Sequence, residues 1–210
     1  MTSVLHIEAS PRRGASHSAE LARELIDVYV GRYPQSVVET VDVWNTDLPP
    51  FDATMIEAKF AVLKGRDPTP EQKVRWAQAL SLSQNFNRAD AYVISLPMWN
   101  YGIPYRLKHY IDVVTLPGQN WSWSKAEGYR PLLSGKKAAL IYSGAADYPD
   151  GISADGYADF QKPYMRQWLR FIGVKVVGEV VVAPTLTDPD DLARIKETGR
   201  RKARSIAMEI

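Results

Sequence analysis

The stretch SVLHIEASPRRGASHSAEL, residues 3–21, joins a short apolar run to a helical pattern through a polar loop. The run at 3–9 is typical of a buried strand, and residues 17–33 place Leu21, Leu25, Val28 and Tyr29 on one face of a helix. The connecting loop, SPRRGASHS, holds three serines, a glycine and two arginines. A buried strand that passes directly into a helix indicates an α/β fold.

The same alternation continues along the chain and predicts a parallel sheet covered by helices on both faces. We expect five strands in the flavodoxin-like order 2-1-3-4-5, formed by one domain spanning residues 1–210. In that order, ligands bind beyond the carboxyl ends of strands 1, 3 and 4. The further strands are expected at 36–44, 89–99, 136–146 and 174–185, and the further helices at 53–88 in two pieces, 103–115, 159–173 and 189–210.

Three residues predict where helices begin and end. Thr69 is expected to cap the second piece of 53–88, with Pro70 in its first turn and Gln72 completing a capping box. Gly173 is expected to close the helix before the last strand. Asp188 is expected to cap the last helix.

The composition excludes several kinds of chemistry. The chain has no cysteine, so disulfides, thiol catalysis and Cys-ligated metals are absent, and its three histidines, His6, His17 and His109, are not at metal-ligand spacing. A net charge of +2 gives no broad basic surface, so we expect no nucleic-acid partner. No run of eighteen apolar residues and no secretory leader occur, so we expect a cytoplasmic protein without a membrane anchor.

The loop after the first strand is interpreted as a phosphate site. It contains neither the dinucleotide-binding glycine fingerprint nor the Walker motif. Unpaired N–H groups at the start of the following helix still attract an anion, and the Ser10, Ser16 and Ser18 hydroxyls add donors. Arg12 or Arg13 would supply the countercharge, and His17 would contribute its backbone amide. The simpler alternative is an ordinary serine cap.

The loops after the third and fourth strands are expected to hold a flat ring. Met98 and Trp99 can form an apolar wall, Asn100 can bond ring heteroatoms, and Gly102 permits close approach. Small residues at 143–146 leave room beside a planar ligand. Taken separately, the first loop could be a buried strand end and the second a tight turn.

The sequence resembles the FMN-dependent NADH:quinone oxidoreductases, also called azoreductases, of the flavodoxin-like superfamily. SPRRGASHS, PMWNYGIPYRLKHYID and GKKAALIYSGAADYPDG carry the resemblance, which spans nearly the whole chain and includes FIGV at 171–174. It implies a homodimer that binds one non-covalent FMN per subunit and passes two electrons from NADH or NADPH to quinones and azo compounds by a ping-pong mechanism. It requires no catalytic side chain and no metal. The FMN contacts that it implies are Ser10, Ser16, His17 and Ser18 for the phosphate, Met98, Trp99, Asn100 and Tyr101 for the ring and ribityl chain, and Ser143, Gly144, Ala145 and Ala146 for the other ring edge.

Two segments depart from the family's usual pattern. The family commonly has Arg-Gly-Gly after the serine of the third loop, where this chain has Gly144, Ala145 and Ala146. The segment NWSWS, 120–124, carries Trp121 and Trp123, which either stack on an aromatic acceptor or pack a dimer interface.

Other functions stay open at this point. Tyr148 and water are both possible proton donors. A flavodoxin-type electron carrier, an NAD(P)H-dependent flavin reductase and an FMN sensor could use the same fold. A serine esterase or phosphodiesterase without flavin is the remaining alternative, with His17 or His109 as its base, although no G-x-S-x-G motif occurs.

Overall fold

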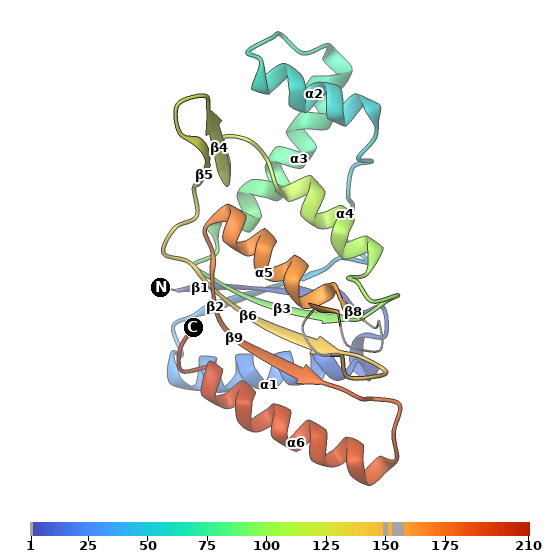
Figure 1. The fold of residues 1–210 in the computed structure, drawn as a ribbon. Helices are drawn as coiled ribbons and strands as arrows, with labels where there is room; N and C mark the ends of the chain where they lie inside the picture. Colours follow the sequence, from blue (N-terminus) through green and yellow to red (C-terminus); the bar gives the residue numbers. More distant parts are fainter. Residues whose placement is uncertain (1, 149–150, 153–157) are drawn as a thin grey trace.

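A five-stranded parallel sheet in the order β2-β1-β3-β6-β9 forms the centre of the molecule (Figure 1). The structure is a computed structural model and describes residues 2–148, 151–152 and 158–210. The sheet strands are β1 (Ser3–Glu8), β2 (Val37–Asp42), β3 (Ala91–Pro97), β6 (Lys137–Ser143) and β9 (Lys175–Val182). In chain order these are strands 1 to 5, so the predicted order 2-1-3-4-5 is confirmed.

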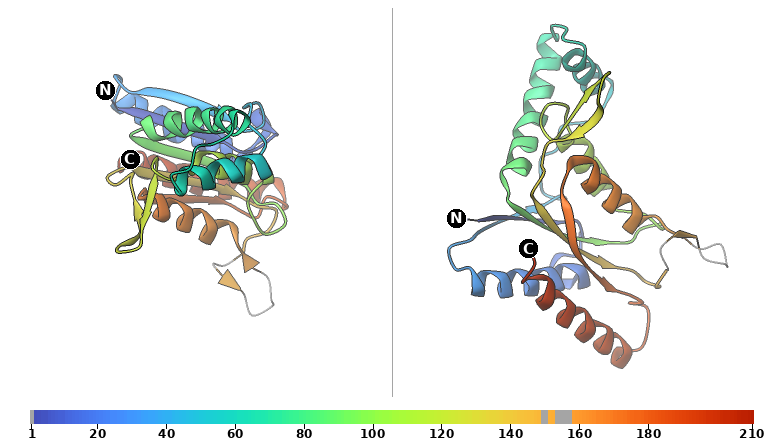
Figure 2. Two further views of the ribbon diagram at one scale, coloured as in Figure 1. Left: turned by 90° about the horizontal axis from the view of Figure 1, so that it is seen from above. Right: turned by 60° about the vertical axis from the view of Figure 1, so that its left-hand side comes forward.

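Helices cover both faces of the sheet (Figures 1 and 2). On one face, α1 (His17–Arg32) and α6 (Pro189–Ile206) lie side by side and bury Leu21 and Leu25 against Val93 and Val180. The other face is covered by α4 (Tyr105–Val114), α5 (Gln161–Ile172) and the end of α3 (Pro70–Arg88). Strands that are buried on both sides explain why the sequence shows continuous apolar runs rather than alternation.

A smaller group of elements, here called the outer lobe, extends beyond α4 and α5 (Figure 1). It consists of α2 (Ala53–Leu63), the start of α3, and an antiparallel hairpin of β4 (Trp121–Ser124) and β5 (Gly128–Pro131). The short elements of the chain are η1 (Arg13–Ala15), β7 (Gly151–Ile152) and β8 (Ala158–Asp159). β4 carries both tryptophans of the NWSWS segment. Trp121 is 6% exposed and packs within the lobe, whereas Trp123 is 57% exposed.

The three predicted helix ends are confirmed. Thr69 and Gln72 form a complete capping box at the start of α3, and the Asp188 carboxylate accepts from two backbone N–H groups of α6. Gly173 closes α5 with a φ of 92°, which glycine adopts without strain. The predicted strands run one to three residues too far at most of their ends, because loop residues continue the apolar pattern.

Both described ends of the chain lie at the amino-terminal edge of the sheet (Figure 1). β1 begins at Ser3, and the Lys137 ammonium at the start of β6 donates to the Glu209 carbonyl at 2.6 Å. The carboxyl ends of the strands point the opposite way, toward the predicted site. None of the described helices is long and apolar enough to cross a lipid bilayer.

Candidate active site

A crevice of about 170 Å³ opens at the carboxyl ends of β1, β3 and β6. The three loops that the sequence predicted to meet do meet there, because the sheet order places these strands next to one another. The residues that line the crevice are Ser10, Arg12, Ser16, His17, Pro97, Met98, Trp99, Ser143, Gly144, Ala145 and Thr185.

The loop after β1 presents hydrogen-bond donors at one end of the crevice. The Ser10 and Ser16 side chains are buried, and Ser16 also caps α1 by accepting from the Ala19 N–H at 3.3 Å. Among the hydrogen bonds of the described residues, none uses the backbone N–H of His17 or Ser18. The N-terminus of a sixteen-residue helix therefore offers free donors and the positive end of its dipole to an anion.

The structure distinguishes the two arginines of this loop. Arg12 lines the crevice, whereas the Arg13 guanidinium pairs with the Asp42 carboxylate at 3.2 Å and lies outside it. Arg12 is therefore the cation that faces a bound anion. His17 also lines the crevice, and its pKa is lowered by burial and then by the charges of Lys196 and Arg12.

The loop after β3 forms a two-residue hairpin. The backbone groups of Trp99 and Gly102 exchange two hydrogen bonds of 3.0 Å each, with Asn100 and Tyr101 at the tip. Both tip residues have positive φ, 48° and 67°, as a type I′ turn requires. Such a backbone is strained for a tyrosine, and strain of this kind is often found at functional sites. Asn100 and Tyr101 do not line the crevice, unlike Met98 and Trp99.

The loop after β6 is closely packed around Gly144. A Cβ at this position would lie 2.9 Å from the Ala146 carbonyl oxygen, so the turn has no room for a side chain here. The Thr185 N–H donates to the Gly144 carbonyl at 2.8 Å, and this bond brings the segment after β9 to the crevice. The sequence did not predict Thr185 as a crevice residue, although Thr185 follows β9, which is the neighbour of β6 in the predicted strand order.

An aromatic group stands behind Trp99. The Trp44 and Trp99 rings lie 5.5 Å apart, and the Tyr105 ring packs edge-on against Trp44 at 5.3 Å. The Trp44 indole N–H donates to the Ala9 carbonyl at the end of β1 and so fixes the group to the sheet. Sequence reasoning missed Trp44 because it follows the edge strand β2, where no site was expected.

Besides Asn100 and Tyr101, three further predicted residues lie beside the crevice rather than in its wall. Ser18 is fully buried, and its hydroxyl is 3.2 Å from that of Ser16. Ala146 contributes its carbonyl oxygen to the turn around Gly144. The Tyr148 ring contacts Tyr101 at 5.5 Å. Of the motif GKKAALIYSGAADYPDG, 135–151, residues 149–150 lie outside the described part of the chain.

The histidines do not form an accessible pair with serine in the described residues. His6 contacts the Ser95 hydroxyl at 3.0 Å, but both side chains are buried in the sheet. His109 bonds the Pro49 carbonyl at 2.9 Å, which makes it a structural residue of α4. The described residues also contain no cluster of acidic and histidine side chains suited to a metal. The arrangement therefore gives no support to a serine hydrolase.

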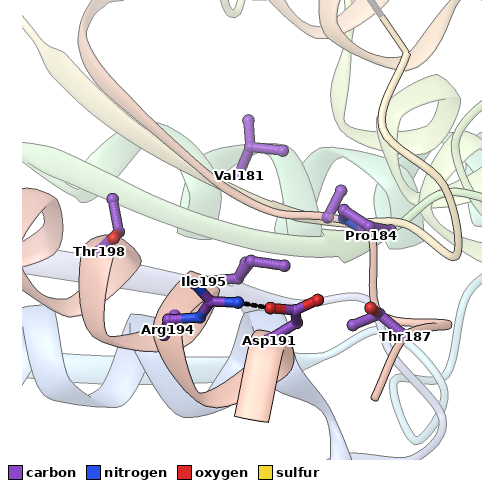
Figure 3. A pocket seen from close by; sticks show the side chains of 8 residues that line it. Val181, Pro184, Thr187, Asp191, Arg194, Ile195 and Thr198 are labelled. Carbon is purple, nitrogen blue, oxygen red and sulfur yellow. Dashed lines mark ion pairs between the residues drawn. The ribbon is translucent and has the colours of Figure 1, made fainter. Parts of the chain in front are cut away.

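A larger groove of about 480 Å³ lies between the end of β9 and α6 (Figure 3). Its Arg194 side chain is turned toward Asp191 and forms an ion pair with it, as Figure 3 shows. Val181 and Ile195 supply apolar surface, and Thr187 and Thr198 supply hydroxyls. The crevice combines buried hydroxyls, free N–H groups and the Arg12 cation, so it is the better site for an anionic ligand.

Comparison with known proteins agrees with this geometry. Residues 2–206 match a family described as having a flavodoxin-like fold. The chain is 38% identical to an FMN-dependent NADH:quinone oxidoreductase of Desulfotalea psychrophila over 210 residues, which cover 100% of this chain and 98% of the relative. The chain belongs to this oxidoreductase family. A second relative, FMN-dependent NADH:quinone oxidoreductase 3 of Pseudomonas fluorescens, is 36% identical over 211 residues and covers the same shares.

Solved structures extend the family likeness to three dimensions. The crystal structure of an azoreductase from Bacillus anthracis strain Sterne superposes with a TM-score of 0.88 at 28% identity, and the match covers 100% of both chains. The family resemblance carried by the three loops is thus confirmed, together with the flavodoxin-like fold.

Proposed function

We propose that this chain is an FMN-dependent oxidoreductase that transfers two electrons from NADH or NADPH to quinones and aromatic azo compounds. The observation that carries the proposal is the division of the crevice into two ends. One end holds buried hydroxyls, free N–H groups and Arg12, and the other is walled by Pro97, Met98 and Trp99. The family's relatives named as FMN-dependent NADH:quinone oxidoreductases give independent support.

The residues of the crevice fit an FMN molecule in two parts. Ser10, Ser16, Arg12 and the backbone N–H groups of His17 and Ser18 would hold the phosphate. A volume of about 170 Å³ is below the roughly 300–1,000 Å³ of whole-ligand pockets, so the crevice would enclose the phosphate and only the nearest part of the rest of FMN. The flat ring would lie at the open mouth, against the residues proposed as its contacts: Met98, Trp99, Asn100, Tyr101, Ser143, Gly144, Ala145 and Ala146.

Bound FMN would supply the two-electron redox chemistry, so the chain's own residues have to bind and orient rather than react. Trp99, backed by Trp44, forms a flat apolar surface on which an aromatic acceptor can lie. Tyr148 or water would deliver protons to the reduced acceptor. Donor and acceptor would use the same open mouth in turn, which gives ping-pong kinetics.

The visible spectrum of the purified protein tests the proposal directly. We expect flavin absorbance, its loss when NADH is added without oxygen, and its return when a quinone follows. Steady-state oxidation of NADH with a quinone separates the enzyme from an electron carrier. A protein that binds no flavin when FMN is supplied in excess, or that holds flavin but is not reduced by NADH or NADPH, contradicts the proposal.

The proposal also includes a homodimer, a single domain and a cytoplasmic location. Large side chains are exposed around the mouth, and exposed apolar groups gathered in this way mark interaction surfaces. They are Trp99, Tyr101, Tyr105 and Phe160. We expect sedimentation to give twice the chain mass, limited proteolysis to release no stable fragment of residues 1–210, and cell fractionation to recover the protein with the cytoplasm. A monomer at micromolar concentration contradicts the first of these expectations.

A further inference from the structure

A buried ion pair lies at the start of α5, close to the carboxyl ends of the strands (Figure 1). The Lys162 ammonium group is 3.1 Å from the Asp159 carboxylate, and the two residues are 8% and 2% exposed. The same carboxylate accepts from the Lys162 backbone N–H at 2.9 Å, which anchors the first turn of the helix. A buried pair of this kind seldom makes a protein more stable than apolar residues of the same size would, so its value lies in what it holds in place.

The Lys162 ammonium group also reaches the loop after β6. It donates to the Tyr148 backbone carbonyl at 3.1 Å. Hydrogen bonds from a charged donor are about twice as strong as bonds between neutral groups. Because Asp159 fixes the ammonium group, the Tyr148 backbone is attached to the start of α5 rather than to a freely moving side chain.

A second contact attaches the start of α5 to the loop after β3. The Phe160 N–H, next in the chain to Asp159, donates to the Tyr101 carbonyl at 2.9 Å. Tyr101 has a φ of 67°, and a strained backbone of this kind persists only where its surroundings fix it. The Tyr101 and Tyr148 rings lie 5.5 Å apart. One helix start therefore holds both tyrosines together beside the crevice.

We infer that Lys162 is a positioning residue, which fixes Tyr148 through its backbone carbonyl so that the Tyr148 ring orients an aromatic acceptor at the mouth. Lys162 does not line the crevice, so it acts through Tyr148 and not on a ligand. The inference rests on the proposed function, because the mouth has to receive an acceptor. A displacement of about 1 Å in such a wall can slow an oriented reaction up to about 100-fold.

Reoxidation of the reduced flavin by a quinone tests the inference without using NADH. The full-length protein loaded with FMN is reduced with one equivalent of dithionite and mixed with menadione, a two-ring quinone. In Lys162→Met we expect reoxidation to be slower by about tenfold or more, with FMN affinity changed less than about threefold, because only the orientation of the acceptor is lost. Lys108→Met is the matched control, since the Lys108 ammonium group pairs with Asp112 at 2.7 Å on the exposed side of α4.

Two combined variants separate positioning from stability. Lys162→Met leaves the Asp159 carboxylate buried without its ammonium partner and should therefore lower stability as well. Adding Asp159→Asn removes that charge and keeps an acceptor for the helix N–H, so stability in urea should return while reoxidation stays slow. Tyr148→Leu should also slow reoxidation, and adding Lys162→Met to it should cause no further loss, because the two residues act as one unit.

Amide hydrogen exchange gives a measurement that does not depend on activity. In the variant that combines Asp159→Asn and Lys162→Met, the Phe160 N–H should exchange faster than in the unchanged protein, with or without flavin. The N–H groups of β3 and β6 should keep their protection, because their hydrogen bonds lie within the sheet. Faster exchange throughout the sheet would show general destabilisation instead.

Several results would overturn the inference. Rapid reoxidation in Lys162→Met removes the role of Lys162, and recovery of both rate and stability in the doubly substituted variant shows that the pair is structural only. A further loss on adding Lys162→Met to Tyr148→Leu shows that Lys162 acts by another route. A flavin that dithionite reduces and NADH does not contradicts the proposed function and leaves these comparisons intact. In a protein that binds no flavin, an unchanged rate of Phe160 exchange overturns the inference.

Discussion

The crevice and a second cavity, here called the outer cavity, are built by opposite means. The crevice uses small residues, backbone N–H groups and short hydroxyls at the ends of parallel strands, with Gly144 placed where a Cβ does not fit. The outer cavity, between α2, the β4–β5 hairpin and the far ends of α4 and α5, uses large rings from three elements, such as Trp121 of β4 and Trp168 of α5. We therefore expect substitutions in the crevice to change ligand affinity more than folding, and substitutions in the outer cavity to change folding first.

The largest expected effect is on stability in the outer cavity. Trp168 is 6% exposed, donates its indole N–H to the Thr115 hydroxyl at 3.0 Å and packs on Phe86. Trp168→Ala should lower the free energy of unfolding by about 3–5 kcal/mol, because it leaves a cavity in the core and removes the indole hydrogen bond to Thr115. Urea denaturation measures the loss. Trp123→Ala, on the exposed part of the hairpin, should cost less than about 0.5 kcal/mol.

The contrast drawn between the crevice and the outer cavity is wrong if Trp168→Ala leaves the free energy of unfolding unchanged. It also fails if the folded variant loses FMN affinity, which the separation of the two sites does not predict. Fluorescence titration of the flavin with folded protein measures this affinity.

The next largest effect is expected on the pH dependence of stability, at the buried pair formed by His6 and Ser95 in the sheet. Burial, and to a smaller extent Arg23, lowers the pKa of His6 to about 4 from an ordinary value of 6.5. The unfolded chain therefore binds the proton first, and stability that is present above pH 6.5 is lost as the pH falls toward 4. The loss amounts to about 3 kcal/mol.

The substitution His6→Gln should flatten the dependence of the free energy of unfolding on pH between 4 and 6.5. His109→Gln, which changes a histidine outside the sheet, is the control and should keep the slope. An unchanged slope in His6→Gln means that other groups cause the acid sensitivity. Denaturant titrations at several pH values provide the measurement.

The sequence predicted the crevice better than it predicted the outer cavity. Each crevice loop is contiguous, directly follows a buried strand, and lies at one edge because parallel strands end together. The sheet order, the helix caps and most of the crevice wall could therefore be predicted. Thr185 and Trp44 could not, because they reach the crevice through contacts between neighbouring loops and carry no local pattern. The outer cavity joins residues from Lys59 to Phe171, which no spacing relates.

Substitutions of the two arginines in the loop after β1 test which of them binds the phosphate. Arg12→Met should weaken FMN binding about 10- to 100-fold, the usual value of a hydrogen bond to a charged group. Arg13→Met should change it less than about threefold, because Arg13 is occupied by Asp42 on an exposed surface. Titration of the flavin-free protein measures both constants. Riboflavin, which lacks the phosphate, should bind the two variants equally, and equal losses of FMN affinity would contradict the assignment.

The smallest expected effect comes from one methyl group. Gly144→Ala places a Cβ 2.9 Å from the Ala146 carbonyl oxygen and should weaken FMN binding several-fold, with a stability loss of about 1 kcal/mol. Gly102→Ala meets its nearest atom, the Trp99 carbonyl oxygen, at 3.9 Å and should be tolerated. FMN titration and thermal unfolding measure the losses of affinity and stability, and we expect both losses to be larger in Gly144→Ala than in Gly102→Ala. A reversed order would show that the Gly144 turn adapts easily.

The position of the two described chain ends has a practical consequence. Ser3 and Glu209 lie at the amino-terminal edge of the sheet, on the side away from the crevice. A tag, a fused reporter or a linker to an electrode attached at either end would project from the back of the molecule. An immobilised protein would thus keep its mouth turned toward the solution, where small redox dyes can reach it.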